Sequence, residues 1–202
     1  MKALEARIAD LQVLKLIRKW LQAPIWEPGK PMKPNDKGTP QGGVISPLLA
    51  NLYMHWFDKT FHGPGGPSTW AKATLVRYAD DFVIMARYMT KEIVAWTETL
   101  LQGRFGLTIN KEKTKIVDLG KSKQELLFLG FSMKLVEPRR IPGWKFCLTT
   151  PSQKSIKKAR EKIRKLTHVK NGYKPIKMVV EQLNLFLGGW GQYFRKGHPS
   201  AA

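Results

Sequence analysis

Residues 75–85 read Leu-Val-Arg-Tyr-Ala-Asp-Asp-Phe-Val-Ile-Met, so that two adjacent carboxylates stand between two apolar runs. The runs at 75–76 and 82–85 are rich in residues that favour strands, and the connection between them is short. We therefore predict a β-hairpin with Ala79 and Asp80 near its bend.

The carboxylates of Asp80 and Asp81 are adjacent like charges, which repel each other unless a cation neutralises them. Oxygen ligands of this kind suit Mg²⁺, and a pair of Mg²⁺ ions held by carboxylates can promote in-line attack on a phosphate. Taken alone, the doublet also fits an ordinary turn, because Asp accepts local backbone hydrogen bonds there.

The charge of the chain points to a polyanionic partner. Among 202 residues there are 35 Lys and Arg against 15 Asp and Glu, a formal net charge of +20. Nucleic acid is the simplest partner of this kind. A membrane surface would instead require a basic amphipathic helix that exposes large apolar residues, whereas here the basic residues are spread along the chain.

Composition also limits the class of protein. A chain of 202 residues that is 43% hydrophobic is long and apolar enough to fold around a core. Its apolar runs are too short to span a bilayer, and residues 1–21 lack the apolar centre of a secretory signal. The single Cys147 fits a reducing compartment, so we expect a cytoplasmic protein without membrane contact. The four histidines are scattered and show no metal-ligand spacing.

The spacing of apolar residues and the positions of helix-start and helix-end residues predict an α+β fold over residues 1–150 and a small helical region over 151–202. Asp10 is expected to cap a helix to about Leu21, and Ser46 and Pro47 to be the N-cap and first residue of another helix. In the rest of the first region we expect a loop at 63–67, a helix from Thr90 to about Gly103, and strands at 107–109 and 115–119. We also expect a hairpin of 126–136 with 144–149. The second region should contain helices at 152–166 and 176–187.

Several motifs stand together in one order along the chain. They are Gly38-Thr39-Pro40-Gln41-Gly42-Gly43-Val44-Ile45-Ser46-Pro47-Leu48-Leu49-Ala50-Asn51, Arg77-Tyr78-Ala79-Asp80-Asp81-Phe82, Gly106-Leu107, Asn110-Lys111-Glu112-Lys113-Thr114, Phe128-Leu129-Gly130-Phe131, Leu183-Asn184 and Gly189-Trp190-Gly191-Gln192-Tyr193-Phe194-Arg195. This series resembles the palm and the thumb, or maturase-specific region, of the reverse transcriptases encoded by bacterial group II introns. The resemblance implies a polymerase palm-like antiparallel sheet packed on helices, followed by a small helical thumb segment, and RNA-templated DNA synthesis with two Mg²⁺ ions.

The resemblance also implies roles for the residues of the palm. Asp80 would be a ligand of both ions and Asp81 its supporting carboxylate. Tyr78 and Ala79 would lie beneath the primer terminus. Gln41 and Gly42 would line the pocket for the deoxynucleoside triphosphate, where glycine allows close approach of the backbone. Apart from the resemblance, Gly42 and Gly43 fit a flexible loop.

Further roles follow for the later part of the chain. Lys113 would assist pyrophosphate departure as an acid, although a solvated turn lysine is an equal alternative. Phe128, Leu129 and Gly130 would form the primer-grip turn, which can equally be a buried hairpin edge. Cations of the helix from Ser152 would contact the template–primer backbone or, in the other interpretation, simply be solvated; they are Lys154, Lys157, Lys158, Arg160, Arg164 and Lys165.

The resemblance further leads us to expect that this chain lacks the other essential aspartate, which in the family lies on a strand upstream, and lacks the fingers. Asp10 is rejected as a substitute because it fits a helix N-cap. We therefore expect little polymerase activity from the isolated chain, and an upstream fragment as a possible partner besides RNA template, DNA primer and intron RNA. The alternative function is a non-catalytic RNA-binding maturase remnant. A retron or diversity-generating reverse transcriptase is disfavoured by residues 38–51 and 189–195.

Overall fold

The computed structural model describes residues 1–24, 29, 31, 43–121, 124–138, 141 and 143–198. The chain forms two compact units, residues 1–109 and residues 110–202, which we call unit 1 and unit 2. Both combine helices with antiparallel strands, which confirms the predicted α+β class. The boundary predicted at residue 150 separates functional regions and stays a prediction.

Unit 1 contains the predicted hairpin, formed by β1 (Thr74–Tyr78) and β2 (Asp81–Met85). Tyr78 pairs with Asp81, so Ala79 and Asp80 are the two-residue loop, as predicted. Ala79 has φ +55°, and Asp80 is not among the residues of positive φ. A positive φ at the first loop residue alone is typical of a type II′ turn, whose twist matches that of the strands it joins.

The three longer helices of unit 1 lie close to the predicted positions, whereas two short helices, at 2–5 and 67–70, were not predicted. The helices are α1 (Lys2–Glu5), α2 (Leu11–Gln22), α3 (Ser46–Phe61), α4 (Pro67–Trp70) and α5 (Lys91–Thr99), which continues as a π-helical turn η1 (Leu100–Arg104). Asp10 caps α2 as predicted, since its Oδ1 accepts from the amides of Gln12 and Val13 at 2.7 and 3.2 Å. Helix α3 begins one residue earlier than predicted, because Ile45 already has helical φ and ψ and precedes Ser46 as the cap.

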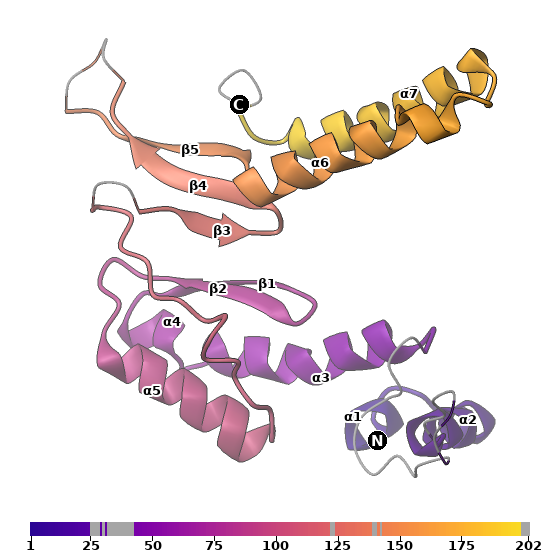
Figure 1. Ribbon diagram of the computed structural model, residues 1–202. Coiled ribbons are helices and arrows are strands. Elements are labelled where there is room, and N and C mark those ends of the chain that lie inside the picture. Colours follow the sequence, from indigo (N-terminus) through magenta and orange to yellow (C-terminus); the bar gives the residue numbers. More distant parts are fainter. Residues whose placement is uncertain are drawn as a thin grey trace. The chain divides into compact units, whose positions relative to one another are not determined.

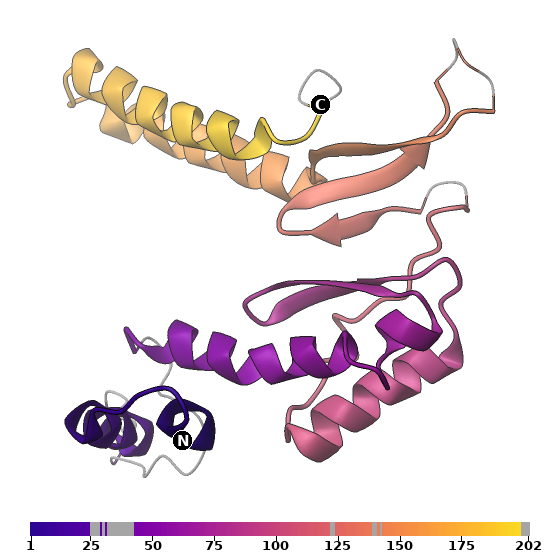
Figure 2. The ribbon, with the colours of Figure 1, turned by 180° about the vertical axis from the view of Figure 1, so that it is seen from behind.

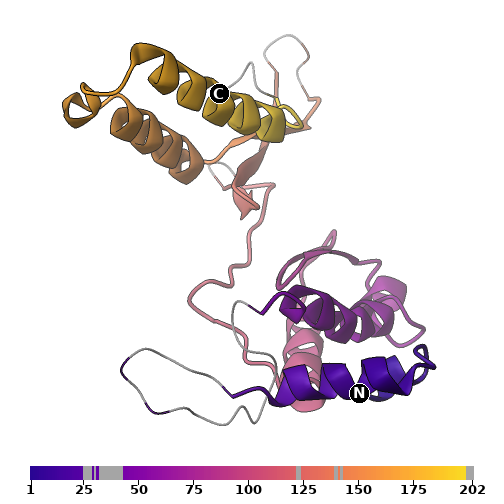
Figure 3. The ribbon, with the colours of Figure 1, turned by 90° about the vertical axis from the view of Figure 1, so that its right-hand side faces the viewer.

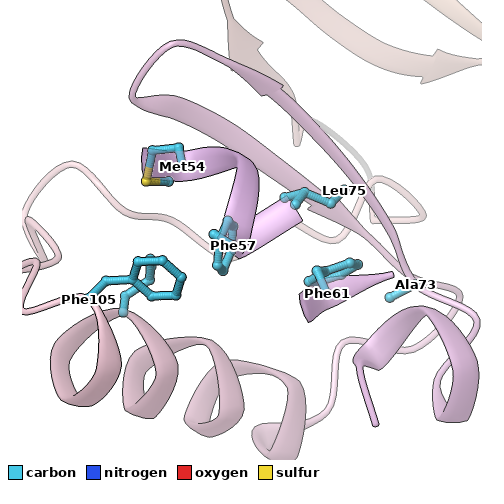
Figure 4. Packing of buried hydrophobic residues seen from close by; sticks show 7 residues of the cluster. Met54, Phe57, Phe61, Ala73, Leu75 and Phe105 are labelled. Carbon is cyan, nitrogen blue, oxygen red and sulfur yellow. The ribbon is translucent and has the colours of Figure 1, made fainter. Parts of the chain in front are cut away.

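The core of unit 1 lies between the hairpin and helices α3 and α5, which are on the same side of it (Figures 1 and 2). Phe57 and Phe61 of α3 are fully buried and point into this space together with Phe105 (Figure 4). Phe57 also meets Phe82 of β2, with ring centroids 5.4 Å apart. An isolated two-stranded hairpin is only marginally stable, so this apolar contact with α3 is what stabilises the Asp-Asp hairpin.

Two predicted strands are not formed. The amide of Leu107 donates to the carbonyl of Leu101 at 2.8 Å and so closes the end of the preceding helix instead of joining a ladder. Residues 115–119 have no paired strand within the part of the chain that the structure describes. Both predictions were wrong because apolar alternation indicates an extended segment, whereas a strand also needs a partner. The predicted turn at Asn110 is present, since its Oδ1 accepts from the amides of Glu112 and Lys113.

Unit 2 begins with a three-stranded antiparallel sheet of order β3-β4-β5, made of β3 (Leu126–Phe128), β4 (Phe131–Val136) and β5 (Phe146–Pro151). The predicted hairpin of 126–136 with 144–149 is present as β4 and β5, but a turn at Leu129 and Gly130 divides its first arm into β3 and β4.

The helices of unit 2 follow the sheet: α6 (Gln153–Leu166), the short 3₁₀ helix η2 (Val169–Asn171) and α7 (Ile176–Phe194). Helices α6 and α7 lie side by side (Figures 1 and 3). Ser152 caps α6, with its Oγ accepting from the amide of Ser155 at 3.2 Å. Among the described residues, no helix has the length and apolar character required to cross a bilayer.

Candidate nucleotidyl-transfer site and nucleic-acid interface

The two carboxylates lie at the tip of the hairpin of unit 1. Asp80 is the second loop residue and Asp81 the first residue of β2, and both are exposed. The exposed tip leaves both carboxylates accessible to a cation, and their catalytic role stays a prediction.

One face of the hairpin packs on α3, and the other face is open. Directly paired residues of an antiparallel sheet share a face, so Tyr78 and Asp81 lie together, as do Val76 and Val83. On this face Tyr78 is 66% exposed and Val76 is 43% exposed.

The sequence interpretation missed Arg77, whose side chain lies on the packed face of the hairpin. Its Nε and Nη2 donate to Oδ1 and Oδ2 of Asp58 at 2.8 and 2.6 Å, and its Nη1 donates to Asn51 Oδ1 at 3.0 Å and to the Ala79 carbonyl at 2.7 Å. The hydrogen bonds to Asp58 raise the pKa of Arg77 against the effect of its burial, so it remains charged. Strand alternation was the available signal, because Arg77 shares its face with the buried Leu75.

The donor set at the tip fits Mg²⁺ in its chemistry, because both side chains offer hard oxygen ligands. No group of three or more His, Cys, Asp or Glu that could hold a metal is found among the described residues. Asp80 and Asp81 would supply two of the ligands of an ion at the tip, and other oxygen ligands would have to complete its coordination.

The predicted primer-grip residues form a second tight turn, in unit 2. Phe128 pairs with Phe131, which leaves Leu129 and Gly130 as the loop with φ +49° and +80°. Positive φ at both positions is the pattern of a type I′ turn. A Cβ at Gly130 would lie 3.0 Å from Ser155 Oγ and 3.7 Å from Phe194, so the turn is packed closely against both helices.

The carbonyls of this turn are held by helices α6 and α7. The Gly130 carbonyl accepts from the amide of Ser152 at 2.8 Å and from Ser155 Oγ at 2.9 Å. The Leu129 carbonyl accepts from the hydroxyl of Tyr193 at 2.8 Å, and the Tyr193 ring stacks on Phe131. These contacts, which join the turn to both helices, could not be predicted from the sequence.

The six predicted backbone-binding cations are all exposed on α6; they are Lys154, Lys157, Lys158, Arg160, Arg164 and Lys165. The half-buried apolar residues of α6, among them Ile156 and Ile163, lie on the opposite side of the helix. Within the described residues none of the six cations forms an ion pair. Three of them, Lys157, Arg160 and Arg164, line a shallow depression of about 340 Å³.

The remaining candidates are placed only in part. Lys113 is exposed in the turn that follows Asn110 and belongs to unit 2, whereas Asp80 and Asp81 belong to unit 1. The structure therefore places the carboxylate pair in unit 1, and the second turn and α6 together in unit 2. Gln41 and Gly42 lie outside the described residues.

Residues 1–133 match the family described as reverse transcriptase (RNA-dependent DNA polymerase), and residues 156–202 match the group II intron maturase-specific domain. The chain is 30% identical to Protein YkfC of Escherichia coli K12 over 185 residues, which cover 77% of this chain and 47% of that protein. It is 47% identical to Group II intron-encoded protein LtrA of Lactococcus lactis subsp. cremoris over 53 residues, or 26% of this chain and 9% of that protein. The chain thus spans less than half the length of these relatives.

Proposed function

Because the chain belongs to the reverse transcriptase family of group II introns, we propose that it supplies the palm and part of the thumb for RNA-templated DNA synthesis. The observation that carries this proposal is the pair of exposed carboxylates, Asp80 and Asp81, at the tip of a hairpin whose adjoining face is open. An extended primer end can lie along that face and reach the carboxylates.

In this proposal each residue of the hairpin has a stated task. Asp80 and Asp81 hold Mg²⁺, which when bound lowers the pKa of the primer 3′-hydroxyl and neutralises charge on the leaving pyrophosphate. Two ions are expected. Tyr78 offers its exposed ring beneath the primer terminus, and the small Ala79 leaves room there.

Other residues would bind the nucleotide and the duplex. Gln41 and Gly42 line the nucleotide pocket, and Lys113 donates a proton to the leaving group. The turn of Phe128, Leu129 and Gly130 positions the primer strand. The six cations of α6 contact phosphates of the template–primer or of the intron RNA, for which exposed and unpaired cations on one helix face are suited. The exposed thiol of Cys147 is compatible with the cytoplasm, where we place the protein.

We infer that residues 1–202 alone synthesise little DNA. Among the described residues no third acidic side chain joins Asp80 and Asp81, and two carboxylates fill only a few of the octahedral positions around two Mg²⁺ ions. A polypeptide that carries a further aspartate-bearing palm strand is the partner that would complete the site.

The test is primer extension on an RNA template with a DNA primer, deoxynucleoside triphosphates and Mg²⁺. The chain is assayed alone and together with a separately produced segment that supplies the fingers and the other palm aspartate. We expect extension only in the mixture, a loss of at least about 100-fold in Asp80→Ala, and no loss in Asp118→Ala, which removes another exposed carboxylate. Equal extension by Asp80→Ala and the unsubstituted chain would refute the catalytic role, and robust extension by residues 1–202 alone would refute the need for a partner.

A second candidate function is an RNA-binding maturase module that does not polymerise. The observation that favours it is that the basic helix α6 belongs to unit 2, whereas the carboxylates belong to unit 1. Salt-sensitive binding of group II intron RNA that survives Asp80→Ala, together with no DNA synthesis in any mixture, would support this function over the first.

A further inference from the structure

The guanidinium of Arg77 connects the Asp-Asp turn to helix α3. Two of its nitrogens bind both oxygens of Asp58, and the third, Nη1, bridges Asn51 of α3 and the carbonyl of Ala79. That carbonyl belongs to the peptide group between Ala79 and Asp80. Its orientation therefore sets the direction in which the backbone enters Asp80.

The bridge requires arginine. A guanidinium is planar and offers five N–H donors in a fixed fork, so it can bind a carboxylate with one edge and other acceptors with another. A lysine ammonium in the same place could keep an ion pair with Asp58, but it could not also reach the Ala79 carbonyl along a second, fixed direction. The Arg77 side chain is 11% exposed, and its two bonds to Asp58 are partly buried, whereas its bonds to Asn51 and to the Ala79 carbonyl are exposed.

The turn at Ala79 and Asp80 also needs to be stabilised by contacts from outside the turn. Ala79 has φ +55°, a region that L side chains rarely adopt. The next two residues, Asp80 and Asp81, carry adjacent charges that repel each other. Within the described residues the sheet has only two strands, so no further strand supports the tip of the hairpin.

We propose that Arg77 is the positioning residue of the Asp80–Asp81 pair: held by Asp58 and Asn51, it fixes the Ala79–Asp80 peptide and thereby aims the Asp80 carboxylate. The inference deepens the proposed function, on which it rests for the identity of the ion. Arg77 does not touch substrate or metal in this role, and its effect passes through the backbone of the turn.

The test uses the full chain and the variants Arg77→Lys, Arg77→Met and Asn51→Ala. The control is Arg18→Met, which removes the other described ion pair of unit 1, between Arg18 and Glu5. Backbone ¹⁵N relaxation gives the order parameters of Ala79, Asp80 and Asp81. We expect values of about 0.85 in the unsubstituted chain and in Arg18→Met, and a fall towards about 0.6 in Arg77→Lys and Arg77→Met, with a smaller fall in Asn51→Ala.

Arg77→Lys separates positioning from mere stability, because it keeps a cation beside Asp58. A lysine variant with an unchanged melting temperature and a loosened turn supports the proposal. Unchanged order parameters in Arg77→Lys overturn it, even if Arg77→Met unfolds, because Arg77 would then be only a structural ion-pair partner.

A titration with Mn²⁺, monitored by the broadening of the NMR lines of residues 79–82, measures metal binding at the site. We expect half-broadening to need several-fold more Mn²⁺ in Arg77→Lys than in the unsubstituted chain, and selective broadening to disappear in Asp80→Ala. Absence of selective broadening in the unsubstituted chain would count against the proposed metal site alone, while the order parameters would still decide the role of Arg77.

Discussion

Neutralising one row of cations on α6 should weaken RNA binding by an amount that counterion release predicts. The change is the triple variant Lys157→Gln, Arg160→Gln and Arg164→Gln, which removes the exposed cations that line the depression on this helix. Gln has nearly the same helix propensity as Lys and Arg, so α6 should remain folded. Each phosphate contact with single-stranded RNA contributes about 0.7 to the slope of log K against log salt, so the slope should fall by about 2 and the affinity at ~0.1 M salt by about 100-fold.

The assay is fluorescence anisotropy of labelled intron RNA over a series of salt concentrations, with helicity checked by circular dichroism. The matched control neutralises three exposed cations of unit 1, Lys15, Lys19 and Lys91, and so lowers the formal charge of +20 by the same three units. We expect its salt slope to change by less than about 0.5. If the control loses as much slope as the α6 variant, net charge and not the face of α6 determines binding, and the assignment of the interface is refuted.

Two further predictions concern the packing that supports the two turns. Phe57→Ala should destabilise unit 1 by about 3–5 kcal/mol, because the side chain is fully buried against Phe61, Phe82 and Phe105; urea unfolding measures this, and a loss below about 1 kcal/mol would contradict the described core. Gly130→Ala should cost unit 2 about 1–2 kcal/mol, since φ is +80° and a Cβ would lie 3.0 Å from Ser155 Oγ; an unchanged melting temperature would contradict the tight turn.

Local signals in the sequence predicted much of the fold correctly. Asp10 and Ser152 were expected at the starts of helices, and both cap them through their own side-chain oxygens. The bend at Ala79 and Asp80 was also predicted, because apolar runs on both sides leave only a short connection. In each case the interaction that determines the structure joins residues that are close in the sequence, so a short stretch of sequence is enough to predict it.

Contacts between distant residues were not predicted. Asp58 binds Arg77 across 19 positions, and Tyr193 binds the Leu129 carbonyl across 64, so no local pattern joins these partners. The strand expected at 115–119 failed for the same reason, since its formation depends on a partner that local alternation does not specify. The chemical candidates were therefore visible in the sequence, whereas the residues that position them became visible only in the structure.

The central claim is that Asp80 and Asp81 anchor a divalent metal ion, and metal-directed cleavage of the chain tests it most directly. Fe²⁺ placed in a Mg²⁺ site reacts with added hydrogen peroxide to give hydroxyl radicals, hydroxide and Fe³⁺, which ascorbate reduces back to Fe²⁺. The radicals cut the nearby backbone, so the cut marks where the ion is bound. With RNA–DNA template–primer present, the account predicts a cut close to residues 79–82 that excess Mg²⁺ suppresses and that Asp80→Asn abolishes. Cleavage elsewhere in the chain, or a cut near residue 80 that persists in Asp80→Asn, would contradict it.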